Sequence, residues 1–235
     1  MNIALIIAGG SGKRTGQDVP KQFMCVYNKP IVVYTMEKFQ NNANIDLIAV
    51  VCIDGWHDFI KAYARQFGIN KLNRVIEGGG TRHESIYKGL CSLADIASQD
   101  DIILVMDANR PLVEDRVIDD SIEKCKLHQF ALPVAPCVDS MYFSENGDSG
   151  IQNLERSRLF KGQTPESIQY QKAVELYQKA NDQELDALST SALLIHFGEP
   201  VQFSEGSEKN IKITTAEDIE IFKALLNSKN DVWIK

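Results

Sequence analysis

The chain opens with the sequence MNIALIIAGGSGKRTGQDVPKQ, residues 1–22, in which an apolar run meets a glycine-rich turn. Ile3–Ala8 is typical of a buried strand, and three glycines follow it within four residues. Glycines at the end of a strand let the backbone approach a ligand closely and point its N–H groups at phosphate oxygens. Lys13, Arg14 and Lys21 add positive charge beside this turn. The stretch therefore predicts an α/β fold whose first loop binds a phosphate.

Two commoner phosphate-binding motifs do not fit this loop. A Walker A loop requires a glycine where Ile7 stands and a serine or threonine where Arg14 stands. A dinucleotide-binding fingerprint requires a third glycine where Thr15 stands, and an acid further along. A purely structural glycine turn is the alternative, but the three basic residues and the run Pro20-Lys21-Gln22 favour phosphate binding.

The rest of the chain alternates short apolar runs with helical patterns, which is typical of a mostly parallel sheet with helices on both faces. The helical pattern near residue 60 predicts a buried face made by Phe59, Ala62, Tyr63 and Phe67. The last helix is expected to begin at Thr215, with a capping box. We expect one Rossmann-like domain over residues 1–235. The strands are expected at Ile3–Ala8, Leu47–Ile53, Arg74–Glu77, Ile102–Met106, Ala131–Ala135, Val201–Ser204 and Ile211–Ile213.

Residues 138–154 interrupt this alternation. Two short extended runs flank a polar segment in which Asn146-Gly147 indicates a hairpin turn. An isolated hairpin is marginal in water unless it packs on something. We expect residues 137–158 to project as an arm that contacts a second copy of the chain in a homodimer. A hairpin folded back on its own domain is the alternative.

Composition excludes several other classes of protein. The 235-residue chain has a formal net charge of −7, which argues against nucleic-acid binding. No apolar run reaches the ~20 residues that span a bilayer, and the N-terminus lacks the basic start of a signal peptide, so we expect a cytoplasmic protein without a membrane segment. The five scattered cysteines and four histidines show neither disulfide-framework nor zinc-site spacing.

The glycine loop and five later motifs together resemble one known family, the cytidylyltransferases that act on 2-C-methylerythritol phosphate and on ribitol phosphate. The matches follow the same order from Ile3 to Asp218. After the loop they are Gly78-Gly79-Gly80-Thr81-Arg82-His83-Glu84-Ser85, Asp107-Ala108-Asn109-Arg110-Pro111, Asp139-Ser140-Met141, Arg156 with Gln163-Thr164-Pro165, and Asn210-Ile211-Lys212-Ile213-Thr214.

This resemblance implies a nucleotide site for CTP. The backbone and charges of the first loop would line the nucleotide, and the second glycine-rich segment would address the cytosine. Arg14, Lys21 and Lys212 would be catalytic, stabilising charge on the α-phosphate and on the departing pyrophosphate. A solvent-facing lysine on an edge strand is the alternative for Lys212. The implied nucleotide-binding residues are Ala8, Gly9, Gly10, Ser11, Gly12, Lys13, Gly79, Gly80, Ser85 and Asp107.

The resemblance also implies a magnesium ion and an acceptor site. Asp107 follows an apolar strand, and the family places this acid beside the ribose, the acceptor and Mg²⁺; a structural Asp–Arg pair is the alternative. A single carboxylate suffices, because Mg²⁺ also takes phosphate oxygens. The implied acceptor-binding residues are Asp107, Arg110, Ser140, Arg156 and Thr164, with Arg158 as an alternative to Arg156.

One segment departs from the family pattern. The family usually has Thr-Asp near residues 188–192, where this chain has Leu-Ser-Thr-Ser-Ala. Details such as Ala8-Gly9-Gly10 and Lys161-Gly162-Gln163-Thr164-Pro165 favour the ribitol-phosphate branch. The expected reaction is therefore transfer of CMP from CTP to ribitol 5-phosphate. The alternatives are 2-C-methylerythritol 4-phosphate as acceptor, with a role in isoprenoid synthesis, or a CTP-binding regulatory protein without turnover.

Overall fold

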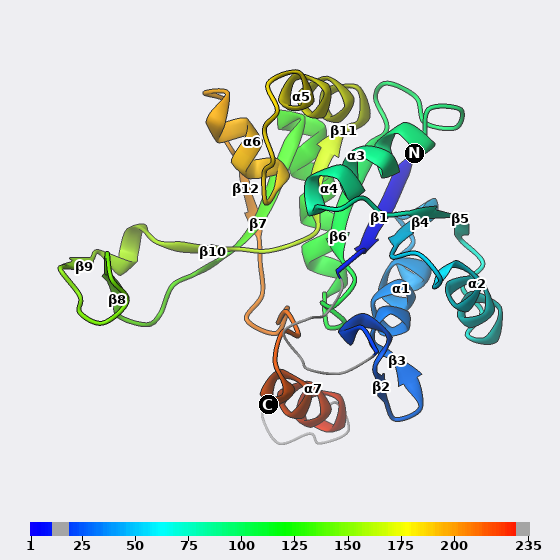
Figure 1. Cartoon of the computed structure of the whole chain (residues 1–235), viewed down its shortest axis with the longest axis horizontal. Coiled ribbons are helices and arrows are strands. Elements are labelled where there is room, and N and C mark those ends of the chain that lie inside the picture. The colour runs from blue at the N-terminus through cyan, green and yellow to red at the C-terminus, as the bar shows by residue number, and fades with distance from the viewer. Residues whose placement is uncertain (11–18, 229–235) are drawn as a thin grey trace.

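A mixed sheet of eight strands forms the centre of the protein (Figure 1). The computed structural model describes residues 1–10 and 19–228. The strands follow the order β10-β7-β11-β6-β1-β4-β5, and β12 pairs with β7. Their bounds are β1 (Asn2–Ala8), β4 (Leu47–Cys52), β5 (Leu72–Glu77), β6 (Ile102–Asp107), β7 (Phe130–Pro136), β10 (Phe160–Gly162), β11 (Glu166–Gln169) and β12 (Phe203–Glu205).

Strand β1 lies in the middle of the sheet and runs parallel to both of its neighbours. Ile3 is in register with Leu47 on β4 and with Ile103 on β6. A strand covered on both faces is expected to be a continuous apolar run, as Ile3–Ala8 is. Because three parallel strands meet here, their carboxyl ends share one edge of the sheet, where ligands bind in open α/β folds.

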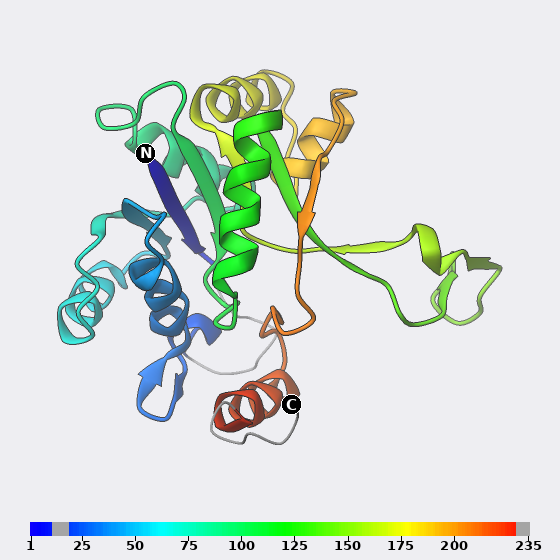
Figure 2. The same ribbon diagram turned by 180° about the vertical axis from the view of Figure 1, so that it is seen from behind.

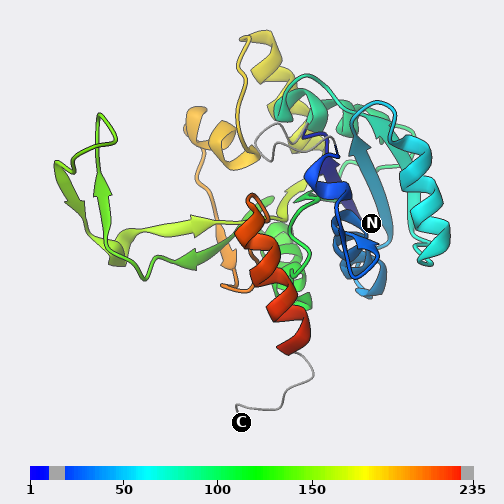
Figure 3. The same cartoon turned by 60° about the horizontal axis from the view of Figure 1, so that its bottom comes forward.

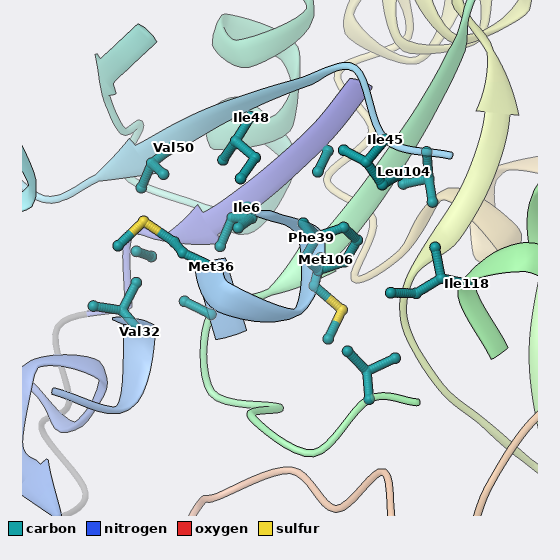
Figure 4. Close-up of a cluster of buried hydrophobic side chains, with 14 of the residues drawn as sticks. Ile6, Val32, Met36, Phe39, Ile45, Ile48, Val50, Leu104, Met106 and Ile118 are labelled. Carbon is teal, nitrogen blue, oxygen red and sulfur yellow. The ribbon is translucent and has the colours of Figure 1, made fainter. Parts of the chain in front are cut away.

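Helices cover both faces of the sheet, and successive residues of β1 alternate between two cores. Figure 4 shows Ile6, Met36 and Phe39 in the first core; Ile3 and Leu5 belong to the second. The first face is covered by α1 (Ile31–Asn41), α2 (His57–Gln66) and α4 (Asp115–His128), of which α4 crosses in front of the sheet in Figure 2. The second is covered by α3 (Arg82–Ser92), α5 (Tyr170–Asp182) and α6 (Thr190–His196).

A third, smaller core joins the two ends of the described chain. Val26 and Ile31 pack there with Ile213 and Phe222. The elements involved are β2 (Cys25–Val26), the start of α1 and α7 (Ala216–Ser228); η2 (Lys21–Phe23) and β3 (Lys29–Pro30) lie on either side of β2 in the chain. The predicted capping box is confirmed, because Thr215 and Asp218 each accept a hydrogen bond from the other's backbone N–H. This core holds the segment after β1 close to the segment that carries Lys212.

Two details of the sequence prediction are wrong. Ile211–Ile213 is not a strand. Instead, Asn109 binds both backbone groups of Ile213, donating from its side chain at 2.6 Å and accepting at its carbonyl at 2.9 Å. Of the four residues predicted to form the buried face of α2, Tyr63 and Phe67 pack against the first core, but Phe59 and Ala62 are exposed. Ile60 and Ala64 are buried in their place. The apolar pattern misled because Phe59 packs at the surface against Trp56, with ring centroids 5.0 Å apart.

The predicted arm projects from the sheet edge, as Figure 1 and Figure 3 show. It carries β8 (Met141–Phe143) paired antiparallel with β9 (Gln152–Leu154), followed by η3 (Arg156–Arg158). At the predicted turn Gly147 has φ +81°, and the side chain of Asn146 accepts from two following amides. Tyr142 is 64% exposed. The arm is therefore an exposed apolar hairpin with little packing on its own domain.

All five cysteines are free, as their spacing predicts. Across residues 1–10 and 19–228, no helix has the length and apolar character needed to cross a membrane.

Gly89 of α3 packs directly against side chains of β1 and β4, so a substitution there tests this packing. A Cβ atom at this position would lie 2.8 Å from Leu5 and 3.0 Å from Val51. We expect Gly89→Val to lower the free energy of unfolding by about 2 kcal/mol, because overpacking a dense core forces neighbouring groups to shift. Urea denaturation measures this change. Ala62→Val on the exposed face of α2 is the control, with an expected change under about 0.5 kcal/mol; equal effects of both substitutions would contradict the packing.

Candidate functional site

A cavity of about 610 Å³ opens at the carboxyl ends of β1 and β6. It lies where the sequence predicts a nucleotide, and every predicted nucleotide-binding or catalytic residue that the structure describes lines it. These residues are Ala8, Gly9, Gly10, Lys21, Gly79, Gly80, Ser85, Asp107 and Lys212. Ser11, Gly12, Lys13 and Arg14 were also predicted and lie outside the described residues.

Gln22 organises the first glycine turn, a role that the sequence analysis did not assign. Its buried side-chain amide donates to the carbonyl oxygens of Ala8 at 2.7 Å and of Gly10 at 2.9 Å. These two bonds satisfy carbonyls at the end of β1. The sequence feature that could have indicated this role is the run Pro20-Lys21-Gln22, because it places Gln22 inside η2, directly after Lys21.

The second glycine segment meets the first at Ser85, in the first turns of α3. The Ser85 hydroxyl accepts from Gly79 N at 3.0 Å and donates to Thr81 O at 2.8 Å. A Cβ atom at Gly9 would lie 3.1 Å from this hydroxyl oxygen. A side chain at position 9 would therefore crowd the Ser85 hydroxyl, and glycine avoids this contact between the two loops. The only hydroxyl proton of Ser85 is used within its own loop, which leaves its oxygen as an acceptor toward a ligand.

Asp107, the last residue of β6, forms the electrostatic centre of the site. It is 6% exposed, and its carboxylate binds Arg82 Nη2 at 3.0 Å, Lys212 Nζ at 2.9 Å and Arg110 Nε at 3.4 Å. Burial acts to raise the pKa of Asp107, but Arg82, Lys212 and Arg110 outweigh it and hold this pKa well below its ordinary value. The carboxylate therefore stays ionised throughout the physiological pH range.

A second cavity of about 430 Å³ adjoins the first, and three residues, Arg82, Asp107 and Lys212, line both. The predicted acceptor residues Arg110 and Thr164 lie in this second cavity. The Thr164 hydroxyl accepts from Asp107 N at 3.1 Å, which ties the floor of the cavity to the end of β6. Two compartments thus share one cationic wall, an arrangement that can bring two phosphorylated molecules together.

Arg82 and Glu166 line the second cavity, and the sequence analysis assigned no role to either. Arg82 lies in the second glycine-rich motif, so the sequence indicated that it lies near the site. Its contact with Asp107 joins residues 25 positions apart and has no local sequence pattern. Burial lowers the pKa of Arg82 and the carboxylates of Asp107 and Glu166 raise it, with a net upward shift. Glu166 had no signal beyond following Pro165.

Ser140 and Arg156 lie in the arm and line neither cavity. Arg156 Nη1 donates to the carbonyl of Val138 at 3.1 Å, across the base of the hairpin. The chain by itself therefore does not bring these two predicted acceptor residues to the site. Their predicted role requires the arm of a second subunit.

Lys212 is not an edge-strand lysine. The neighbouring residue Ile213 is bound by Asn109, and the Lys212 ammonium group binds the carboxylate of Asp107. Within residues 1–10 and 19–228, no cluster of three or more histidine, cysteine or acidic side chains could hold a metal ion by itself. Asp107 is the carboxylate that the described part of the chain presents to the nucleotide cavity.

Comparisons with known proteins agree with this geometry. Ribitol-5-phosphate cytidylyltransferases from Lacticaseibacillus paracasei and Vibrio parahaemolyticus are 37% and 36% identical to the chain, covering 97% and 100% of it and 99% of each relative. A 2-C-methyl-D-erythritol 4-phosphate cytidylyltransferase from Clostridium novyi is 32% identical, with 97% of both chains covered. The crystal structure of the Francisella tularensis 2-C-methyl-D-erythritol 4-phosphate cytidylyltransferase superposes with a TM-score of 0.80 at 26% identity, covering 95% of this chain and 98% of that one.

The match to a family model covers residues 2–228 and carries the description 2-C-methyl-D-erythritol 4-phosphate cytidylyltransferase. The chain therefore belongs to this family of nucleotidyltransferases, which transfer CMP.

Proposed function

We propose that the chain transfers CMP from CTP to D-ribitol 5-phosphate, giving CDP-ribitol and pyrophosphate. The observation that carries this proposal is the pair of adjoining cavities that share Arg82, Asp107 and Lys212. The choice of acceptor is supported by the relatives, because the two ribitol-5-phosphate enzymes are 36–37% identical and the Clostridium novyi methylerythritol enzyme 32%.

In this reaction a phosphate oxygen of the acceptor attacks the α-phosphorus of CTP. The new P–O bond forms as the bond from the α-phosphorus to the bridging oxygen breaks, and pyrophosphate leaves. Such a step needs positioned reactants and positive charge rather than covalent help from the protein. Lys212 borders both cavities and Lys21 borders the nucleotide cavity, which supports the proposal that each stabilises the charge that develops at the α-phosphate. Arg14 is proposed to act with them.

Asp107 is proposed to hold Mg²⁺ together with phosphate oxygens of CTP. The donor set fits, because Mg²⁺ in nucleotide sites takes one or two carboxylates and completes its shell with phosphates and water. The ion would neutralise phosphate charge. Since the carboxylate of Asp107 already faces three cations, it keeps its negative charge available at neutral pH.

The acceptor is proposed to occupy the second cavity, between Arg110 and Thr164. Its phosphate would be reached by Ser140 and Arg156 from the arm of the other subunit in a cytoplasmic homodimer. The exposed apolar side chains of Tyr142, Phe143 and Ile151 support this arrangement, since a projecting hairpin needs a partner to cover them.

A second acceptor is favoured by specific observations. The family model and the Francisella tularensis structure both carry the name of the 2-C-methyl-D-erythritol 4-phosphate enzyme. This acceptor is also a phosphorylated polyol, so the cationic wall would serve it equally well. A role as a CTP-binding protein without turnover is disfavoured by the two cavities that adjoin at Lys212.

A panel of acceptors separates these functions. Purified protein with CTP and Mg²⁺ is supplied with D-ribitol 5-phosphate, 2-C-methyl-D-erythritol 4-phosphate or no acceptor, and pyrophosphate release is measured. We expect the highest kcat/KM with ribitol 5-phosphate and no turnover after chelation with EDTA. A preference for the methylerythritol substrate would support the second function, and CTP binding without pyrophosphate from any acceptor would support the binding protein.

Lys21→Ala tests the proposed charge stabilisation. We expect kcat to fall about 100-fold with the fold retained, because a charge contact made in the transition state is lost. Steady-state kinetics and circular dichroism measure the two properties. Lys126→Ala on the exposed end of α4 is the matched control and should keep wild-type kcat. An unchanged kcat in Lys21→Ala would remove this residue from the mechanism.

Mixing two inactive variants tests the crossed arm. Lys21→Ala damages the site that its own subunit forms, whereas Arg156→Ala damages the site on the partner. A hybrid dimer therefore contains one intact site, and random exchange should restore about a quarter of wild-type activity. Coupled pyrophosphate assays before and after subunit exchange measure the recovery. Exchange verified by mass, with no recovery of activity, would place both residues in the site of one chain.

A further inference from the structure

Glu166, the first residue of β11, lies between the sheet and the start of α6 and is only 1% exposed. Its carboxylate accepts three hydrogen bonds from this helix: Ser191 N at 3.0 Å and Ser191 Oγ at 2.6 Å on one oxygen, and Thr190 N at 3.1 Å on the other. Ser189 caps the same helix by accepting from Ala192 N at 3.1 Å. The first amides of α6 are thus satisfied by two side chains, of which Glu166 comes from the sheet.

These contacts fix one wall of the second cavity. Leu188, Ser189 and Ser191 line it, and so does Glu166 itself. Leu188 is 85% exposed and directly precedes Ser189, the residue that caps α6. The hydroxyl of Thr190 meets Tyr177 at 3.1 Å, which holds the other side of the same turn. The segment facing the acceptor is therefore tied to the sheet through Glu166.

Glu166 also sets the balance of charge around this cavity. Arg82, Arg110 and Lys212 bring three positive charges to its walls, and Asp107 and Glu166 are the acids among its lining residues. Both carboxylates act on Arg82 and on Arg110. Without Glu166, one carboxylate would face three cations in a largely buried space, where charge interactions are stronger than in water.

We propose that Glu166 is a positioning residue that determines which polyol phosphate the second cavity accepts, by fixing the wall at residues 188–191 and by offsetting part of its cationic charge. This inference rests on the proposed function. It names the part of the site that recognises the polyol rather than the nucleotide. Its effect should fall on the acceptor, because Glu166 does not line the nucleotide cavity.

Glu166→Gln removes the charge and keeps the size of the side chain. The glutamine amide NH₂ cannot accept, so at least one of the donors from Thr190 and Ser191 loses its partner and the wall shifts. We expect KM for ribitol 5-phosphate to rise about tenfold or more while KM for CTP stays within about twofold. The ratio of kcat/KM between ribitol 5-phosphate and 2-C-methylerythritol 4-phosphate should change at least about fivefold.

Two further variants complete the experiment. Ser191→Ala removes only the hydroxyl contact and should raise the acceptor KM in the same direction by a smaller factor, about threefold. It also decides the question if Glu166→Gln fails to fold. Glu175→Gln makes the same chemical change on the exposed face of α5 and should leave all constants unchanged.

The outcomes separate this inference from the proposed function. If the wild-type protein turns over ribitol 5-phosphate but Glu166→Gln and Ser191→Ala keep its acceptor KM and selectivity, the inference is wrong and the function stands. Equal increases in both KM values, or a lower melting temperature with unchanged kinetics, would reduce Glu166 to a structural role. If the wild-type protein releases no pyrophosphate with any acceptor, the proposed function itself fails.

Discussion

The ion cluster around Asp107 is the interaction on which the site depends. It joins Arg82 at the start of α3, Arg110 in the loop after β6 and Lys212 before α7. Three like charges so close together would repel one another if the carboxylate were absent, and burial would make that repulsion expensive. The buried carboxylate therefore lets the fold hold these three positive charges together at one edge of the sheet.

The position of this cluster follows from the topology of the sheet. Because β1, β4 and β6 are parallel, their carboxyl ends lie side by side, and each contributes the start of a loop to the same edge. Gln22 binds the carbonyls of Ala8 and Gly10 at the end of β1, Ser85 binds Gly79 after β5, and Asp107 ends β6. Lys212 reaches this edge by another route, through the bonds that Asn109 makes to Ile213. Residues at the ends of the parallel strands and residues from the loop that carries Lys212 therefore meet at one edge of the sheet, where they line both cavities.

The sequence predicted the parts of this arrangement that have local signals. The apolar run of β1, the glycine turns, the capping box at Thr215 and the hairpin at Gly147 all depend on neighbouring residues, and the structure contains them. Contacts between distant segments left no such signal: Arg82 meets Asp107 and Glu166 meets Ser191 only after the chain has folded. The segment around Ile213 shows the same limit. Its apolar alternation matches a strand, but its backbone binds Asn109 in the loop after β6, through both the side chain and the carbonyl of that residue.

Glu166 also offers a physical account of the segment that departs from the family pattern. Residues 188–192 carry no acid where the family usually has Thr-Asp. In the folded chain a carboxylate nevertheless lies against the amides of Thr190 and Ser191, supplied by β11. What such a helix start requires is a buried acceptor of hydrogen bonds, and the chain position of that acceptor is secondary. The wall of the second cavity at residues 188–191 therefore has no acid of its own but is held by a carboxylate from a neighbouring element, a contact that the linear sequence does not show.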